Sequence, residues 1–292
     1  MINADIEQGR ILAYPCLSLY RRFYWLKFTS NYRNFSTDTM AHKLNRFLKV
    51  TSAAILLSMG MGLGFAWSEI IKLTPYDPLA VKQKLEPKLT GHFIADGAPV
   101  FIRIFKETAE LEVWMKNVLG EWVLFQNYPI CYSSGMLGPK LKQGDLQSPE
   151  GFYTVAKSQM NPNSKYHLSF NLGFPNKFDK ANGRTGSYLM VHGNCLSVGC
   201  YAMTDGKIEE IYTLAESAFN NGQESFQVHV FPFRMNDDNM MFYEKSKWIG
   251  FWKNLKQGYD YFEQHKEVPN ITVSGKQYKI TAPAETGFKL WN

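Results

Sequence analysis

The chain has 292 residues, of which 45% are hydrophobic and 20% charged, so it can form a buried core and is too apolar for wholesale disorder. Its formal net charge of +6 is concentrated at the start, because residues 1–66 carry 8 of the 32 basic and 3 of the 26 acidic residues. The 24 basic and 23 acidic residues that follow nearly cancel, which leaves no electrostatic case for nucleic-acid binding.

The first predicted element is a targeting segment over residues 40–68. A short basic stretch begins at Met40, an uncharged run follows from Val50 to Ser68, and Gly64-Phe65-Ala66 resembles a small-x-small cleavage site. This order predicts a secretory signal peptide, with an uncleaved inner-membrane anchor as the alternative. We interpret residues 1–39 as an extension from a misassigned start. The remainder of the chain is then expected in the periplasm.

The chain after this segment is predicted to begin with a proline-punctuated lead-in at 69–99, followed by a catalytic domain at 100–234. Alternating or continuous apolar runs predict short strands, with glycine- and proline-rich loops between them. The predicted strands are 100–105, 110–116, 121–126, 128–134, 152–157, 188–192 and 225–233. Short strands at this spacing predict an α+β fold that is mainly β, with an antiparallel sheet or sandwich.

Two helices are predicted after residue 204. Asp205 is the expected N-cap of the first, whose apolar residues recur at three- and four-residue steps as far as Phe219. The second carries an aromatic stripe from Trp248 to Phe262, which we interpret as core packing rather than a sugar-stacking surface. Residues 235–292 are therefore expected to form an aromatic-rich helix and a terminal hairpin packed on the catalytic domain.

The segment VHGNCLSVGCYAMTD, residues 191–205, carries the strongest chemical signal. It places His192 at the end of a predicted strand and Cys200 eight residues later. An imidazole accepts the proton of a thiol, or as imidazolium holds the thiolate, so the pair predicts a base and a nucleophile for acyl transfer. Gly199 permits unusual backbone torsions, and the amides of 199–201 are candidates for an oxyanion hole.

The same segment allows three other interpretations. His192, Cys195 and Cys200 are potential zinc ligands, although no second cluster with zinc spacing is present in the sequence. A disulfide between Cys195 and Cys200 would suit an oxidising compartment, and a purely structural loop is the third alternative. With Cys131 the exported part has three cysteines, so at least one thiol stays unpaired within the chain. His229 is a rival base in the middle of a predicted strand.

Several ordered motifs resemble the L,D-transpeptidase catalytic domain family of the YkuD type. His192-Gly193 followed by Ser197-Val198-Gly199-Cys200 is similar to its HG…S-x-G-C signature. The segment 138–155, GPKLKQGDLQSPEGFYTV, resembles a glycine-containing loop of the family followed by its G-D-x-x-(T/S)-P-x-G-(F/Y) motif. The segment 171–193 resembles the approach to its active-site histidine. The similarity runs from about residue 100 to residue 234, and with the tryptophan-rich tail it is closest to the murein YafK-like branch.

This resemblance implies an L,D-transpeptidase-type, β-sandwich-like catalytic domain with flanking helices that uses no metal and no cofactor. It implies that Cys200 attacks the carbonyl of meso-diaminopimelate in a peptidoglycan stem peptide, with His192 as the base. The thioester then passes to an amine, for cross-linking or lipoprotein attachment, or to water. The resemblance carries Ser197, Gly199 and Gly193 over as supporting residues.

Two departures from the family signature bear on the outcome of the reaction. Val198 stands where the common signature has a second histidine, and the separation of His192 and Cys200 is shorter than in most members, which suggests a trimmed lid. Hydrolysis of the same bond is therefore the alternative to transpeptidation, and a non-catalytic cell-wall-binding domain is the alternative of another class. Apart from the resemblance, Arg184 is a candidate partner for a substrate carboxylate, with a solvated surface arginine as the competing interpretation.

Overall fold

The computed structural model describes residues 75–283. The predicted extension at 1–39 and the predicted targeting segment at 40–68 therefore lie outside the described residues. Within 75–283, no helix combines the length and the apolar composition that crossing a membrane requires.

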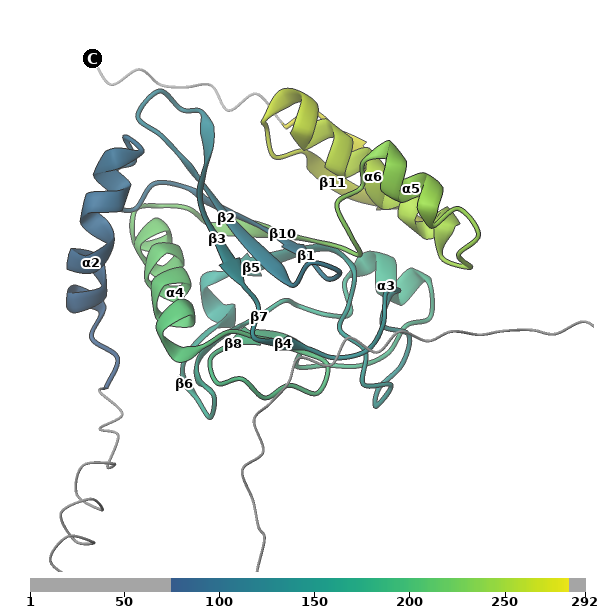
Figure 1. Cartoon of the computed structure of the whole chain (residues 1–292), viewed down its shortest axis with the longest axis horizontal. Coiled ribbons are helices and arrows are strands. Elements are labelled where there is room, and N and C mark those ends of the chain that lie inside the picture. The colour runs from purple at the N-terminus through teal and green to yellow at the C-terminus, as the bar shows by residue number, and fades with distance from the viewer. Residues whose placement is uncertain (1–74, 284–292) are drawn as a thin grey trace, which may run out of the picture. The chain divides into compact units, whose positions relative to one another are not determined.

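Five strands form the first sheet (Figure 1). In spatial order they are β3 (Trp122–Pro129), β2 (Glu110–Lys116), β1 (Val100–Phe105), β10 (Ser225–Phe231) and β5 (Gly151–Ala156). β1 pairs antiparallel with β2 and parallel with β10, and β10 pairs antiparallel with β5. The sheet is mixed, so the prediction of an antiparallel sheet is wrong for the β1–β10 pair.

β1 lies in the middle of this sheet, and its side chains alternate between the two faces of the sheet. Val100, Ile102 and Ile104 belong to the core that also holds the apolar residues of α4 (Asp205–Asn220). Phe105 belongs to the core that holds residues of α6 (Ile249–His265). Because side chains on successive strand residues point to opposite faces, a sheet covered on both faces buries all six residues of β1.

The second sheet carries the predicted chemical residues. Its spatial order is β4 (Tyr132–Ser133), β9 (Tyr201–Ala202), β8 (Met190–His192), β7 (His167–Asn171) and β6 (Met160–Ser164). The strand predicted at 188–192 is shorter than expected. Tyr188 is 75% exposed and has φ of 55°, a left-handed backbone conformation that does not continue a strand.

Helices cover the first sheet on both sides. α2 (Pro78–Gly91) lies within the predicted lead-in and packs beside α4 (Figure 1). Asp77 caps α2, because its carboxylate accepts from the backbone amides of the first turn. At α4 the N-cap is Thr204 rather than Asp205, and the Asp205 carboxylate instead accepts the Asn194 N–H at 2.7 Å.

The C-terminal elements lie on the other side of the first sheet from α4 (Figure 1). They are α5 (Asp237–Phe242), α6 and the antiparallel hairpin of β11 (Asn270–Ser274) and β12 (Gln277–Thr281). The aromatic stripe of α6 is buried from Trp252 to Phe262, so the core-packing interpretation is confirmed. A short helix α3 (Lys177–Ala181) and a 3-10 turn η1 (Lys157–Gln159) complete the described elements.

Candidate active site

Cys200 and His192 lie at neighbouring positions of the second sheet. His192 is the last residue of β8, and Cys200 immediately precedes β9. β8 and β9 pair parallel, with Val191 opposite Tyr201 and His192 opposite Ala202. The loop 193–200 therefore runs back along β8 and places Cys200 beside Met190, whose N–H lies 3.4 Å from the Cys200 sulfur. The side chains of His192 and Cys200 line one cavity of about 560 Å³. The structure therefore brings together the two residues that the sequence predicts as base and nucleophile.

The rest of this cavity is mostly apolar and aromatic. The remaining lining residues are Tyr132, Tyr166, Cys195, Leu196, Ser197 and Val198. The ring of Tyr166 lies 4.7 Å from the His192 ring, between centroids, with the planes tilted by 30°. No sequence motif identifies Tyr166, which occupies the turn between β6 and β7. Leu196 and Val198 are 68% and 74% exposed, so the rim of the cavity is open to water.

A disulfide joins Cys131 to Cys195 across the cavity edge, with 5.4 Å between the Cα atoms. The interpretation of Cys195–Cys200 as a disulfide is therefore wrong. The pairing also removes the Cys195 thiolate from the proposed zinc ligands. Cys200 is the free cysteine of the described residues, which gives Cys195 a structural role and leaves Cys200 available as a nucleophile.

Three serine hydroxyls hold the backbone around Cys200. Ser197 Oγ donates to the Cys200 carbonyl at 2.8 Å, and Ser148 Oγ donates to the same oxygen at 3.2 Å. The Gly199 N–H donates to Ser134 Oγ at 2.5 Å. The Gly199 amide is thus already satisfied within the fold, so the oxyanion hole predicted at 199–201 does not have this N–H available.

The two glycines of the motif are required for different reasons. Gly199 has φ of 102°, a conformation that side chains rarely adopt, while a Cβ there would meet only ordinary contacts. A Cβ at Gly193 would lie 2.7 Å from Asp205 Oδ1 and 2.8 Å from the Tyr166 carbonyl oxygen. Gly193 therefore allows the close approach of two backbone segments beside His192.

We expect Gly193→Ala to lower the free energy of unfolding by about 1–3 kcal/mol, since the added methyl overpacks a closed site. Chemical denaturation followed by circular dichroism measures the change. Gly206→Ala is the matched control, because Gly206 lies in α4 and its Cβ would meet nothing within 4 Å. Equal stability of the Gly193→Ala protein and the wild type would contradict the close approach.

Burial makes the His192–Cys200 pair neutral in the resting protein. It lowers the pKa of His192 below its usual value of 6.5, and it raises the pKa of Cys200 above its usual value of 9.0. The N–H of Met190, 3.4 Å from the Cys200 sulfur, and the charge of Lys140 oppose the rise in the Cys200 pKa. The sequence left two roles open for His192: an imidazole that accepts the thiol proton, or an imidazolium that holds a thiolate. The two pKa shifts favour the first, a neutral imidazole beside a neutral thiol.

The tautomer of His192 follows from its hydrogen bond. Nδ1 lies 2.5 Å from the Gly193 carbonyl oxygen, which only accepts, so Nδ1 carries the proton. Nε2 of the neutral ring then has the lone pair and can act as the base.

We expect kcat/KM to fall on acidification through a group whose pKa lies below 6.5, because protonation of His192 removes the predicted base. Alkylation of Cys200 by iodoacetamide should rise with pH around a pKa above 9.0, and should be slower at neutral pH than that of an ordinary cysteine. Peptide-resolved mass spectrometry across pH measures this rate for Cys200 alone. Fast alkylation at pH 7 would show instead a preformed thiolate.

Two further residues singled out in the sequence lie outside the cavity lining. The Arg184 guanidinium is buried, pairs with Asp179 at 2.8 Å and lies over the Phe251 ring at 4.7 Å from its centroid. The structure thus gives Arg184 an internal partner rather than an open position, and its contact with a substrate carboxylate stays a prediction. His229 is buried in β10 beside the Phe152 ring, and burial holds its pKa well below the usual value.

Residues 101–230 match the model of the YkuD family, the L,D-transpeptidase catalytic domain. The chain belongs to this family. It is 48% identical over 188 residues to the protein named "Putative L,D-transpeptidase YafK" of Escherichia coli strain K12, an alignment that covers 64% of this chain and 76% of that protein. The counterpart in Escherichia coli O157:H7 gives the same figures.

Two similar solved structures are more distant. The helical cell shape determining protein Pgp2 from Campylobacter jejuni is 19% identical with a TM-score of 0.36, covering 65% of this chain and 80% of that one. Bd1075 from Bdellovibrio bacteriovorus is 18% identical with a TM-score of 0.35, covering 63% of this chain and 91% of that one.

Proposed function

We propose that this protein is a cysteine acyl-transfer enzyme acting on meso-diaminopimelate-containing peptidoglycan stem peptides. One observation carries the proposal: Cys200, the free thiol of residues 75–283, lines the same cavity as His192. Membership of the L,D-transpeptidase family supports the choice of substrate class.

The geometry supports a general-base mechanism. Nε2 of neutral His192 accepts the thiol proton as the Cys200 sulfur forms a bond to the substrate carbonyl carbon. The imidazolium then gives this proton to the departing amine as the C–N bond breaks, which leaves a thioester on Cys200. In the second half an acceptor attacks the thioester carbonyl, His192 takes the acceptor's proton, and the thiol is restored.

Transfer to an amine makes the protein a transpeptidase, and transfer to water makes it a hydrolase. One observation favours the second outcome as an alternative: Leu196 and Val198 are exposed at the rim, so water reaches the thioester position. Hydrolysis in this site would trim stem peptides or release a peptidoglycan-linked lipoprotein.

The proposed compartment is the periplasm, where the substrate would be met. The Cys131–Cys195 disulfide supports this compartment, because such bonds persist in oxidising surroundings and are rare in the cytosol. The predicted signal peptide or inner-membrane anchor at 40–68 would deliver the chain there.

Incubation of the purified protein with tetrapeptide muropeptides tests the proposal. A thioester should appear in intact-mass spectra as an acyl adduct that maps to Cys200. Chromatography of the products separates the outcomes, because new cross-linked muropeptides indicate transfer and shortened stems without cross-links indicate hydrolysis. Absence of both the adduct and any product would contradict the proposal and leave the wall-binding alternative.

A further inference from the structure

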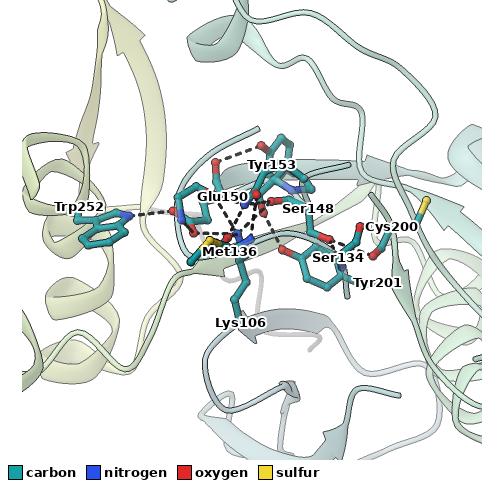
Figure 2. A network of polar contacts seen from close by, with 12 residues as sticks. Lys106, Ser134, Met136, Ser148, Glu150, Tyr153, Cys200, Tyr201 and Trp252 are labelled. Carbon is teal, nitrogen blue, oxygen red and sulfur yellow. Dashed lines mark hydrogen bonds and ion pairs between the residues drawn. The ribbon is translucent and has the colours of Figure 1, made fainter. Parts of the chain in front are cut away.

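A buried carboxylate connects α6 to the glycine loop, which we define as residues 135–151 (Figure 2). Oε2 of Glu150 accepts the indole Nε1–H of Trp252, on α6, at 2.8 Å. Oε1 of Glu150 accepts the backbone N–H of Gly138 at 2.6 Å and lies 3.0 Å from Nζ of Lys106. One fully buried side chain thus joins α6, the end of β1 and both ends of the glycine loop.

Lys106 holds the backbone of this loop from inside. Its Nζ lies 2.8 Å from the Met136 carbonyl oxygen, 2.9 Å from that of Gly138 and 3.1 Å from that of Ser148. Burial lowers the pKa of Lys106, and the charge of Glu150 opposes that change. A buried ammonium is stable only when a carboxylate and hydrogen-bond acceptors surround it. Glu150 supplies the carboxylate for Lys106, so the loop carbonyls that Lys106 binds keep their position only while Glu150 is in place.

The glycine loop in turn holds the nucleophile. Ser148, whose carbonyl contacts the buried ammonium, donates through Oγ to the Cys200 carbonyl at 3.2 Å and accepts the Ser134 N–H at 3.1 Å. The next residue, Pro149, accepts the Tyr201 hydroxyl at 2.7 Å. Figure 2 shows this network with Trp252 at one end and the sulfur of Cys200 at the other.

Two close approaches fix α6 against the same segment. A Cβ at Gly258 of α6 would lie 2.6 Å from the Phe152 ring, so the helix packs directly on β5. A Cβ at Gly138, whose φ is 130°, would lie 2.4 Å from the Trp248 indole nitrogen, so this ring covers the loop backbone. The Trp252–Glu150 hydrogen bond therefore lies within a tightly packed contact.

We propose that Trp252 and Glu150 are positioning residues for Cys200, so that the C-terminal segment is part of the catalytic apparatus. Trp252 lies outside residues 101–230, which match the family model, so the positioning comes from beyond that catalytic domain. The expected effect of these residues on turnover rests on the proposed function. Their expected effect on the reactivity of the Cys200 thiol does not.

The test replaces Trp252 by Phe in the full chain, which removes the N–H donor and leaves Glu150 Oε2 unpaired. Trp114→Phe is the matched control. Nε1 of Trp114 also donates to a buried carboxylate, Oε2 of Glu112, at 2.8 Å, and Glu112 contacts Arg103 rather than the glycine loop. Trp114 also contacts α6, because its ring lies 4.9 Å from that of Phe262. The two variants therefore remove the same kind of hydrogen bond beside the same helix, one made to the glycine loop and one not.

We expect Trp252→Phe to lower kcat by about tenfold with KM within about twofold, because a displaced nucleophile loses alignment while substrate contacts persist. The Cys200 thiol should become more hydrated, so the midpoint of its alkylation against pH should move down toward that of an ordinary cysteine. Trp114→Phe should leave kcat and the alkylation profile at wild-type values, whatever its thermal stability.

The proposal is overturned if Trp252→Phe has the alkylation profile of the wild type. It is also overturned if the profile changes while kcat does not, or if Trp252→Phe and Trp114→Phe change equally. If Trp252→Phe does not fold, benzothienylalanine at position 252 keeps the bicyclic ring without the N–H and decides in the same way. If the wild type lacks activity on muropeptides, the proposed function fails, while the alkylation comparison still decides whether Trp252 positions Cys200.

Discussion

Cys200→Ala is expected to lose at least about 10⁴-fold in kcat on muropeptides while keeping the fold, since it removes the sulfur that we propose forms the thioester. Its far-ultraviolet circular dichroism should match the wild type, because Cys200 lies partly exposed at the cavity and contributes little to the cores. Product chromatography and intact-mass spectra of the same samples measure the loss of turnover and of the acyl adduct.

His192→Gln provides the companion measurement. Residues that act as a unit are not additive, so the Cys200→Ala, His192→Gln double variant should be no slower than the worse single variant. If the double variant instead loses the product of the two single fold-decreases in kcat, Cys200 and His192 act independently of each other. If Cys200→Ala turns over muropeptides at the wild-type rate, the protein is not a cysteine enzyme acting at this site.

The Cys131→Ser, Cys195→Ser double variant is expected to lose about 4 kcal/mol of unfolding free energy. The disulfide closes a sequence separation of 64 residues, and loss of this constraint lets the unfolded chain expand. Guanidinium unfolding curves with and without reductant measure the effect.

The wild type in reductant should match the double variant, and reductant should not change the double variant further. A single Cys131→Ser variant tests whether the disulfide keeps Cys195 from reacting with Cys200. In this variant Cys195 is a free thiol five residues before Cys200 in the same loop. Oxidation of that variant should inactivate it reversibly, whereas the oxidised wild type stays active. Identical unfolding midpoints for the wild type and the double variant would show that the bond contributes nothing to stability.

The placement of His192 and Cys200 at one cavity was predictable from sequence because its signal is local. His192 ends an apolar run, and Cys200 follows within a glycine-containing loop, so one short segment carries both groups. The fold class was predictable for a related reason. The alternation of polar and apolar residues in β2, and the three- and four-residue spacing of aromatic residues in α6, indicate the type of each element and its core-facing side.

The remainder depends on contacts between distant segments. Nothing local in the sequence pairs Cys131 with Cys195, because that choice depends on β4 lying beside β9 in the second sheet. The Lys106–Glu150 contact likewise requires β1 and the glycine loop to meet, and both residues look like ordinary surface charges in sequence. The prediction for the Asp205 side chain failed because its carboxylate has a partner in the preceding loop, at Asn194.

The order of the cysteines along the chain has a consequence for biosynthesis. In a chain exported N-terminus first, Cys131 and Cys195 reach the oxidising side before Cys200. An oxidant that joins cysteines in the order of their emergence would therefore form the native Cys131–Cys195 bond and leave the last thiol reduced. If the chain is exported as proposed, this order of emergence would favour the native Cys131–Cys195 pairing over the pairings that use Cys200.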